Sequence, residues 1–435
     1  MTPSSKKTII TPARVIALGF ILVILTGSVL LSLPAAHSGN GKVEYLDALF
    51  TSVSCVCVTG LSTVELGVAF STFGQVVALI LIQIGGLGIT SLGVGVFVLL
   101  GGKIRRRNSS IVKEALNYQT WNGIAPLIRS VIIMDFSFEI AGAIAFFFSF
   151  KKEYPTGKAI WMSAFHSISS FNNAGFDIIG HGNSIGDYTG DIYFNIVTAL
   201  MIIFGGLGFF VIRELITHRK KEKFSLHTKI VLMMTGILLI AGTLIIKLTE
   251  RENISWLGAF FASTTARTAG FATYPLSGFS NAGLLVMCAL MFIGASPGST
   301  GGGIKTTTIY ALIKSLMATS SGKEARSFSK KIPDNILYKS FIIVSFGLLW
   351  AIMTSVLMCM FETGVSMRDA IFECFSAFGT VGLSTGITPS LTNASKILII
   401  ITMYIGRLGP LTIATMFAKE KKSGVSRPEE SFPIG

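Results

Sequence analysis

Four short segments of this chain share one pattern, a glycine followed directly by a large apolar residue. A phenylalanine stands ten residues before each of these glycines, and a serine or threonine stands six before. Glycine reaches backbone angles that other residues adopt only at a cost, so such a segment can turn successive C=O groups inward. A ring of backbone oxygen atoms of this kind can replace the hydration shell of an ion. The segments are residues 57–61, 172–176, 267–271 and 379–383, with their glycines at Gly60, Gly175, Gly270 and Gly382.

One glycine of this kind would more often serve close helix packing or a turn, because glycine is common in membrane helices. Four glycines in one register, each behind an apolar stretch, reverse that preference. The pattern therefore indicates a fourfold internal repeat.

The composition indicates an integral membrane protein. Hydrophobic residues make up 51% of the 435 residues, and charged residues make up only 13%. The formal net charge of +14 could suggest a nucleic-acid partner, but a soluble nucleic-acid binder would not carry repeated uncharged runs of about twenty residues. We therefore expect a lipid bilayer as partner and no nucleic acid. The candidate spans are residues 15–33, 73–100, 131–150, 192–212, 230–246, 282–304, 340–361 and 397–417.

Between the two spans of each repeat lies an apolar stretch too short to cross a membrane. These stretches are residues 47–59, 162–174, 257–269 and 369–381. They predict re-entrant half-helices, each followed by an extended loop. Irregular backbone at membrane depth must line water or be buried in protein, and four such loops satisfy this by meeting around one axis. The half-helices would then point their negative dipole ends at that axis, which favours a cation.

The expected fold is an all-α membrane protein with four repeats of span, pore helix, loop and span. Eight transmembrane helices and four re-entrant half-helices would surround a pseudo-fourfold central pore. We expect a cytoplasmic arm (residues 1–11), repeat 1 (12–110), repeat 2 (111–226), repeat 3 with a broken inner helix (227–322), repeat 4 (323–418) and a cytoplasmic tail (419–435). Lys and Arg are concentrated in the termini and alternate loops, so the positive-inside rule places both termini in the cytoplasm of a multi-pass cell membrane protein.

The four repeats with one glycine per loop resemble the Trk/Ktr/HKT superfamily of potassium translocation subunits. The likeness runs from about residue 11 to the tail and is nearest to the bacterial Ktr-type membrane subunit, since only a short basic arm precedes the first span. The resemblance implies potassium uptake through a channel-like pore, with potassium bound at a selectivity filter. That filter would comprise Val58, Thr59, Gly60, Asn173, Ala174, Gly175, Thr268, Ala269, Gly270, Thr380, Val381 and Gly382.

The third repeat carries a stretch rich in Gly, Ser and Pro, residues 294–306, in the middle of its second span. Such a composition unwinds a helix, and the stretch resembles the intramembrane gating loop beneath the filter in this family. A nucleotide-binding loop is a poor alternative, because Ile304 stands between Gly303 and Lys305 and no strand precedes the stretch. The expected gating residues are Ser296, Pro297, Gly298, Gly301, Gly302, Gly303, Lys305 and Arg407.

Several charged residues within apolar segments have two interpretations. Arg407 could set an electrostatic barrier facing the pore or hydrogen-bond to loop carbonyl groups, and these interpretations have equal weight. Arg267 is expected to point away from the pore, paired with a carboxylate or with loop carbonyl groups. Asp135 and Glu139 lie one helical turn apart and should face buried protein together. Small residues of the inner spans, such as those at 84–88 and 204–208, are explained at least as well by close packing or kinking as by a functional role.

The resemblance also implies a homodimer gated by a cytosolic ring of the RCK type that binds ATP, ADP or another nucleotide, with sodium as a possible activator. No organic cofactor is expected in this chain. A coupled secondary cation transporter and a sodium-permeable relative are the alternatives. We expect no enzyme, because the sequence has no catalytic triad, metal-ligand set or ATP motif.

Overall fold

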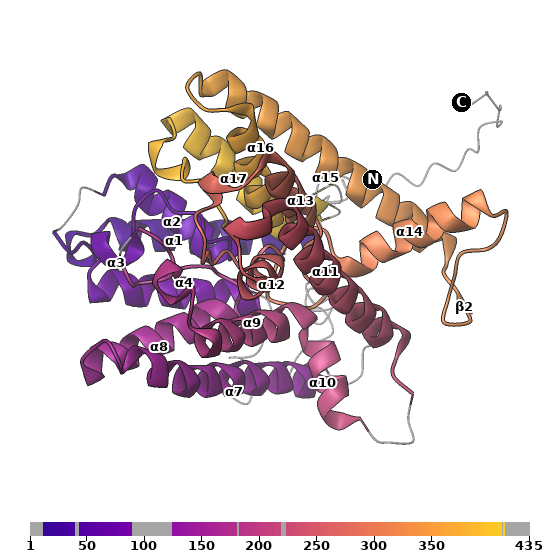
Figure 1. Ribbon diagram of the computed structural model, residues 1–435, viewed down its shortest axis with the longest axis horizontal. Coiled ribbons are helices and arrows are strands. Elements are labelled where there is room, and N and C mark those ends of the chain that lie inside the picture. The colour runs from indigo at the N-terminus through magenta and orange to yellow at the C-terminus, as the bar shows by residue number, and fades with distance from the viewer. Residues whose placement is uncertain are drawn as a thin grey trace, which may run out of the picture.

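The computed structural model describes residues 12–39, 43–88, 124–180, 182–218, 223–410 and 412–413, and most of these residues are helical (Figure 1). Four described helices, here called the outer helices, are long and apolar enough to cross a membrane. The outer helices are α1 (Pro12–Ser32), α7 (Ile124–Phe150), α11 (Leu226–Glu250) and α15 (Asp334–Phe361). Residues 1–11, the loop at 103–123 and the tail at 419–435 lie outside the described part of the chain.

Each outer helix is followed by a short helix that leads into a glycine segment and then by a return helix. The short helices are α2 (Tyr45–Cys57), α8 (Thr156–Phe171), α12 (Trp256–Thr265) and α16 (Met367–Gly379). The return helices are α4 (Thr72–Leu87), α9 (Ile192–Leu207), α13 (Asn281–Phe292) and α17 (Asn393–Leu408). This element order matches the predicted sequence of span, half-helix, loop and span.

The short helices organise the packing of the whole molecule. Each packs against the outer helix that precedes it in the chain, as in α1 with α2 and α7 with α8. Each also packs against a return helix of the preceding group, in the pairs α4 with α8, α9 with α12, and α13 with α16. The last return helix, α17, packs against the first short helix, α2. The four groups therefore follow one another around a closed ring.

Several smaller elements connect these helices. They are η1 (Pro34–Ala36), α3 (Leu66–Ala69), η2 (Gly186–Tyr188), α10 (Phe209–Thr217), η3 (Arg251–Asn253), η4 (Leu276–Gly278), α14 (Thr306–Ser320) and η5 (Thr388–Ser390). A two-stranded antiparallel hairpin follows α14, with β1 (Arg326–Ser327) paired to β2 (Lys330–Lys331). Helix α14 and this hairpin extend sideways from the body of the molecule (Figure 1).

In the third and fourth groups, a glutamate at the end of the outer helix binds the start of the return helix thirty residues later. Glu250 accepts hydrogen bonds from the backbone N–H of Ser280 (3.1 Å) and from its hydroxyl (2.7 Å). Glu362 does the same for Thr392, at 2.7 Å and 2.8 Å. These bonds satisfy helix N-terminal donors that would otherwise be unpaired. They fix where each return helix begins.

The helices of the spans predicted over 73–100 and 397–417 end at Leu87 and Leu408, and residues 89–100 lie outside the described part of the chain. Two further predicted spans are not single straight helices. The span predicted over 192–212 bends by 99° between α9 and α10. Gly208 stands at the bend with a φ of +90°, an angle that a residue without Cβ adopts freely. The span predicted over 282–304 stops at Phe292, and helix resumes only at Thr306. Four described helices, or five with the bent pair, have the length and composition of a span, so the predicted total of eight stays a prediction.

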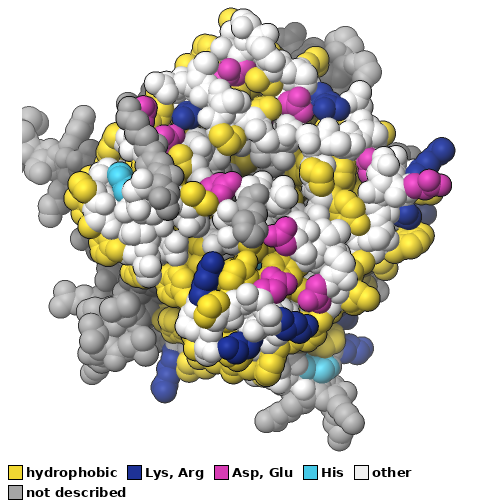
Figure 2. All heavy atoms as spheres, turned by 60° about the vertical axis from the view of Figure 1, so that its left-hand side comes forward, with side chains coloured by type: hydrophobic (Ala, Val, Ile, Leu, Met, Phe, Trp, Pro, Cys, Tyr) yellow, Lys and Arg dark blue, Asp and Glu magenta, His cyan; other side chains and the backbone are white. Residues whose placement is uncertain are grey.

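Side chains on the outer helices point large apolar groups away from the protein. Leu22, Ile140, Leu248 and Leu349 are 67%, 61%, 72% and 68% exposed, respectively. Figure 2 shows one face on which hydrophobic side chains form much of the margin, while many of the Asp and Glu side chains lie further in, some of them near Lys and Arg. An exposed apolar belt of this kind is typical of a surface in contact with lipid.

One ion pair joins the beginning of the chain to its end. Lys396 Nζ of α17 lies 2.9 Å from Asp47 Oδ1 of α2, and their side chains are only 13% and 10% exposed. We expect K396M and D47N each to destabilise the folded protein, and the double variant to show a coupling free energy of about 2 kcal/mol, because a mostly buried charge loses its partner in each single variant. Thermal unfolding of the detergent-solubilised variants measures this cycle. Strictly additive effects would contradict the role of this pair in closing the ring.

Candidate functional site: a ring of four glycine segments

The four glycines lie together in the folded chain, each facing the backbone of the next segment. A Cβ atom on Gly60 would lie 2.6 Å from the carbonyl oxygen of Ala174, and one on Gly175 would lie 2.5 Å from that of Ala269. A Cβ on Gly270 would overlap the carbonyl oxygen of Val381, and one on Gly382 would overlap that of Thr59. The contacts run from the first segment to the fourth and back to the first. Four backbone segments thus form a closed ring in chain order.

The backbone follows one course in all four segments. Each glycine has a positive φ, between +69° and +95°. The residue two positions earlier is also left-handed in every segment, although none of them is glycine: these are Val58, Asn173, Thr268 and Thr380. A left-handed conformation is unfavourable for β-branched residues and costs about 1–3 kcal/mol. A left-handed backbone at four equivalent positions, three of them occupied by β-branched residues, indicates that the ring requires this geometry.

Hydroxyl groups on the short helices hold the segments in this conformation. Ser54 Oγ and Ser376 Oγ each accept a hydrogen bond from the N–H of their segment's glycine, both at 3.1 Å. Ser169 Oγ donates instead to the carbonyl oxygen of Phe176, at 2.7 Å. These three are the residues six positions before the glycine.

The third segment departs from this register by one residue. Thr264, the residue six before Gly270, hydrogen-bonds back to Phe260 O within its own helix. Its neighbour Thr265 donates to the carbonyl oxygen of Phe271 at 2.7 Å and so takes the role that Ser169 has in the second segment. The repeat pattern points to Thr264, one residue before the threonine that makes this bond. Two threonines stand side by side here, so the pattern does not separate them.

The small residues of the return helices allow close packing behind the ring. A Cβ on Gly85, Gly205 or Gly406 would overlap a carbonyl oxygen at the end of the short helix in the same group. Those oxygen atoms belong to Val56, Phe171 and Phe378. Close packing, as expected for the segments 84–88 and 204–208, is found at Gly85 and Gly205, and Gly406 packs in the same way.

The loop between α13 and α14 lies directly against the ring. Its ends pair with each other through the N–H of Gly294 and the carbonyl oxygen of Ile304, 2.9 Å apart. A Cβ on Gly301 or Gly302 would overlap the hydroxyl group of Thr268 or Thr380, respectively. Thr268 and Thr380 stand two residues before the ring glycines. The loop therefore covers the end of the ring at which the glycine segments begin.

Hydrogen bonds attach the same loop to the second group. Ser296 N and Thr300 N donate to the carbonyl oxygens of Gly206 (3.1 Å) and Gly205 (3.3 Å). Phe209 N donates to the carbonyl oxygen of Gly298 at 3.0 Å, at the bend between α9 and α10. Pro297 O lies against Gly208, and a Cβ on Gly303 would lie 3.2 Å from the carbonyl oxygen of Gly379. The sharp bend at Gly208 therefore makes room for the loop.

Two cationic side chains bind the carbonyl groups of this loop. Arg407 donates from its two terminal nitrogens to the carbonyl oxygens of Thr300 and Gly85. Lys305 Nζ donates to Gly301 O at 2.6 Å and to Gly302 O at 3.3 Å. Arg407 thus makes the hydrogen bonds of the structural interpretation, whereas an electrostatic barrier stays a prediction. For Arg267, which is 7% exposed, Nε is buried without a hydrogen-bond partner among the described residues, and the expected pairing stays a prediction.

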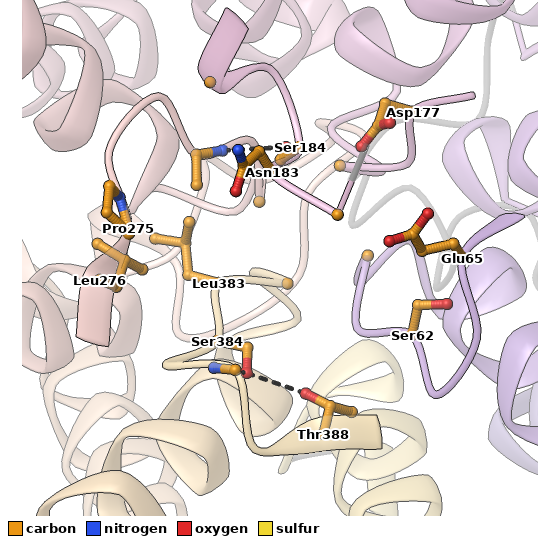
Figure 3. A pocket seen from close by; sticks show the side chains of 18 of the residues that line it. Ser62, Glu65, Asp177, Asn183, Ser184, Pro275, Leu276, Leu383, Ser384 and Thr388 are labelled. Atoms are coloured by element: carbon orange, nitrogen blue, oxygen red, sulfur yellow. Dashed lines mark hydrogen bonds between the residues drawn. The ribbon is translucent and has the colours of Figure 1, made fainter. Parts of the chain in front are cut away.

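On its other side the ring opens into a cavity of about 730 Å³. The cavity is lined by the four glycines and by the loops that follow them, including Glu65, Asp177 and Thr388 (Figure 3). Glu65 and Asp177 lie on one side of it, and Ser384 and Thr388 on another (Figure 3). Burial raises the pKa of the Asp177 carboxyl to about 6, and the nearby Glu65 carboxylate adds to this effect. Polar groups and acidic side chains therefore line the approach to the ring.

Comparisons with known proteins agree with this architecture. A family model described as the TrkH cation transport protein matches residues 6–427. The chain is 36% identical over 442 residues to the potassium/sodium uptake protein NtpJ of Enterococcus hirae, covering 98% of both chains. It is 37% identical over 432 residues to the Ktr system potassium uptake protein B of Bacillus subtilis, covering 96% of both. The fold is similar to the crystal structure of the potassium transporter TrkH from Vibrio parahaemolyticus, with a TM-score of 0.74, 19% identity, and coverage of 95% of this chain and 86% of that one.

Proposed function

Because this chain belongs to the TrkH family of cation transport proteins, we propose that it is the channel-like pore subunit of a potassium uptake system in the cell membrane. The observation that carries this proposal is the closed ring of four glycine segments, since backbone oxygens around one axis are suited to a dehydrated cation. The ions bind at Val58 to Gly60, Asn173 to Gly175, Thr268 to Gly270 and Thr380 to Gly382. Two full-length relatives are named as potassium or potassium/sodium uptake proteins, which supports the choice of ion.

The loop at residues 293–305 acts as the gate in this proposal. It lies against Thr268 and Thr380 on the end of the ring away from the cavity. Lys305 and Arg407 hold it there by hydrogen bonds to its own carbonyl oxygens, and the Arg407 guanidinium places a positive charge next to the cation path. An ion leaving the ring meets this loop, so flux requires the loop to move.

We also infer the orientation and the assembly. The cavity faces outward, and α14, the basic hairpin and both termini face the cytoplasm, since Lys and Arg favour that side. The chain works as a homodimer and is gated by a cytosolic nucleotide-binding ring of the RCK type, with sodium as an activator. The projecting α14 and hairpin, which include the exposed residues Leu316 and Phe328 at 64% and 49%, offer a surface for such a partner.

Expression in a bacterium that lacks its own potassium uptake systems tests the proposed function. We expect the chain, co-expressed with a Ktr-type regulatory subunit, to restore growth in low potassium. The control is the same strain carrying the regulatory subunit without this chain. Sodium accumulation in place of potassium would favour a sodium-permeable relative, and potassium uptake that requires a proton gradient at constant membrane potential would favour a coupled transporter.

The acidic cavity predicts a response to external pH. Asp177 binds a proton as the external pH falls through about 6, because its pKa is raised from the usual carboxyl range by burial and by Glu65. The cavity then carries one negative charge fewer, and capture of cations at low concentration weakens. We expect potassium uptake by the wild type to decrease as the external pH falls through this range. Initial rates at low potassium measure the effect.

The matched variant for this prediction is D177N, which cannot ionise. Its uptake should be low and nearly independent of external pH over the range in which the wild type changes. A D177N variant with the pH profile of the wild type would show that another group controls the response.

A further inference from the structure

A cluster of four polar side chains is buried behind the second glycine segment, away from the ion path. Gln83 lies on α4, Asp135 and Glu139 lie on α7, and Asn172 follows the last residue of α8. Asp135 and Asn172 are 0% exposed, and Glu139 is 4% exposed. The cluster joins the first group of helices to the second at the depth of the ring.

Hydrogen bonds connect the four side chains into one network. Gln83 Nε2 donates to Asp135 Oδ2. Asn172 Nδ2 lies 2.8 Å from Glu139 Oε1, 3.3 Å from Gln83 Oε1 and 3.0 Å from the carbonyl oxygen of Ile168, all of which accept. Three acceptors around this nitrogen fix the orientation of the Asn172 amide group.

The position of Asn172 gives this network control over the ring. Asn172 is followed at once by Asn173, which is left-handed with a φ of 57°, and then by Ala174 and Gly175. A Cβ on Gly86, one turn after Gln83, would overlap Asn172 Oδ1, so the Asn172 side chain lies flush against the α4 backbone. A change in the hydrogen bonds that hold the Asn172 side chain therefore alters the backbone of the second segment.

The charges in the cluster do not balance if both acids are ionised. No Lys, Arg or His side chain within the described ranges forms an ion pair or hydrogen bond with Asp135 or Glu139. His166, on the neighbouring α8, lies instead among Phe146, Phe150 and Phe194, with ring centroids 4.6 to 6.1 Å away. Two uncompensated buried carboxylates one helical turn apart are strongly unfavourable.

The unsatisfied atoms of the cluster identify what neutralises it. Two of its oxygen atoms, Asp135 Oδ1 and Asn172 Oδ1, are buried without a hydrogen-bond donor. A bound metal cation would need about six oxygen ligands, more than these two free oxygens supply. A single proton removes one charge and places a donor at Asp135 Oδ1, one of the two oxygens that have no donor among the described residues.

We propose that Asp135 is protonated on Oδ1 while Glu139 remains ionised, and that this pair with Gln83 and Asn172 positions the second glycine segment. Asp135 then accepts from Gln83 through Oδ2, and the Glu139 carboxylate makes a charge-assisted hydrogen bond with Asn172. Asp135 and Glu139 are positioning residues that do not touch the ion. The positioning role rests on the proposed function of the ring, whereas the assignment of the proton does not.

Infrared difference spectra of the full-length protein in liposomes test the proton directly. The spectrum of wild type minus D135N should contain the C=O stretch of a protonated carboxylic acid, and that of wild type minus E139Q should contain only carboxylate bands. The reverse assignment, or carboxylate bands in both spectra, would overturn the proposal. S137A, which alters an exposed residue of α7 between the two acids, is the control.

The ratio of potassium to sodium flux through the same liposomes tests the positioning role. We expect E139Q to lower this ratio about fivefold, because a charged hydrogen bond to Asn172 becomes a neutral one, and S137A to leave it within about twofold. If E139Q is not recovered folded, Q83M removes the amide that joins Asp135 to Asn172 and should lower the ratio similarly. An unchanged ratio in the folded variant would overturn the positioning role. If G175S changes the ratio while E139Q does not, the proposed function stands and this inference fails; if neither changes it, the ring is not the filter.

Discussion

Replacing Gly60 or Gly270 by serine is expected to lower the ratio of potassium to sodium flux by about tenfold or more in a folded protein. Both glycines have a positive φ, +95° and +89°, at which an L side chain costs about 1–2 kcal/mol. The new Cβ would also press on the carbonyl oxygen of Ala174 or Val381, the atoms that the next segment offers to the ion. A change of about 1.4 kcal/mol in the difference between the free energies for potassium and sodium alters their ratio tenfold. Flux through purified protein in liposomes measures the ratio.

Gly386 provides a matched control for these substitutions. It also has a positive φ, +101°, and lines the cavity, but a Cβ there would meet nothing within 4 Å. G386S therefore carries similar backbone strain without touching the ring. Unaltered selectivity in both G60S and G270S would remove these glycines from the filter, and an equal loss in G386S would attribute the effect to general strain.

Deleting residues 298–302 is expected to raise potassium flux by about tenfold. The deletion removes the carbonyl groups that Arg407 and Lys305 bind and the glycines that lie against Thr268 and Thr380. If the loop is the largest barrier, loss of about 1.4 kcal/mol from that barrier gives this increase. Initial rates of potassium uptake into liposomes measure it.

A milder variant separates the loop from its anchors. K305M leaves the loop at full length but removes two hydrogen bonds to it, so flux should rise less than in the deletion. K314M removes a cation from α14 without touching the loop and serves as the control. Unchanged or reduced flux in a folded deletion variant would argue against gating by this loop.

Much of the architecture could be predicted because it depends on a repeat in register. The phenylalanine ten residues before the glycine is fully buried in three of the four segments, at Phe50, Phe165 and Phe372. A buried anchor at a constant distance from a constrained backbone leaves a pattern in the sequence. The ring contacts among Gly60, Gly175, Gly270 and Gly382 follow from four such patterns.

Features that depend on one group differing from the others could not be predicted in this way. Gly88 and Gly208 end the same Gly-Gly-Leu-Gly motif with φ angles of +77° and +90°, and the motif does not show that the backbone at Gly208 binds a loop supplied by the third group. The sequence also does not show that Thr265, and not Thr264, binds the third segment, since either threonine fits the pattern. The network around Asn172 joins residues 33 and 89 positions apart, and no local spacing shows such contacts.

The most direct test of the account is potassium flux through the purified chain in liposomes under a potassium gradient alone. We predict passive potassium flux that exceeds sodium flux under the matching sodium gradient and that G60S reduces this preference. Potassium movement that occurs only when a sodium or proton gradient drives it would contradict a channel-like pore built on the four glycine segments.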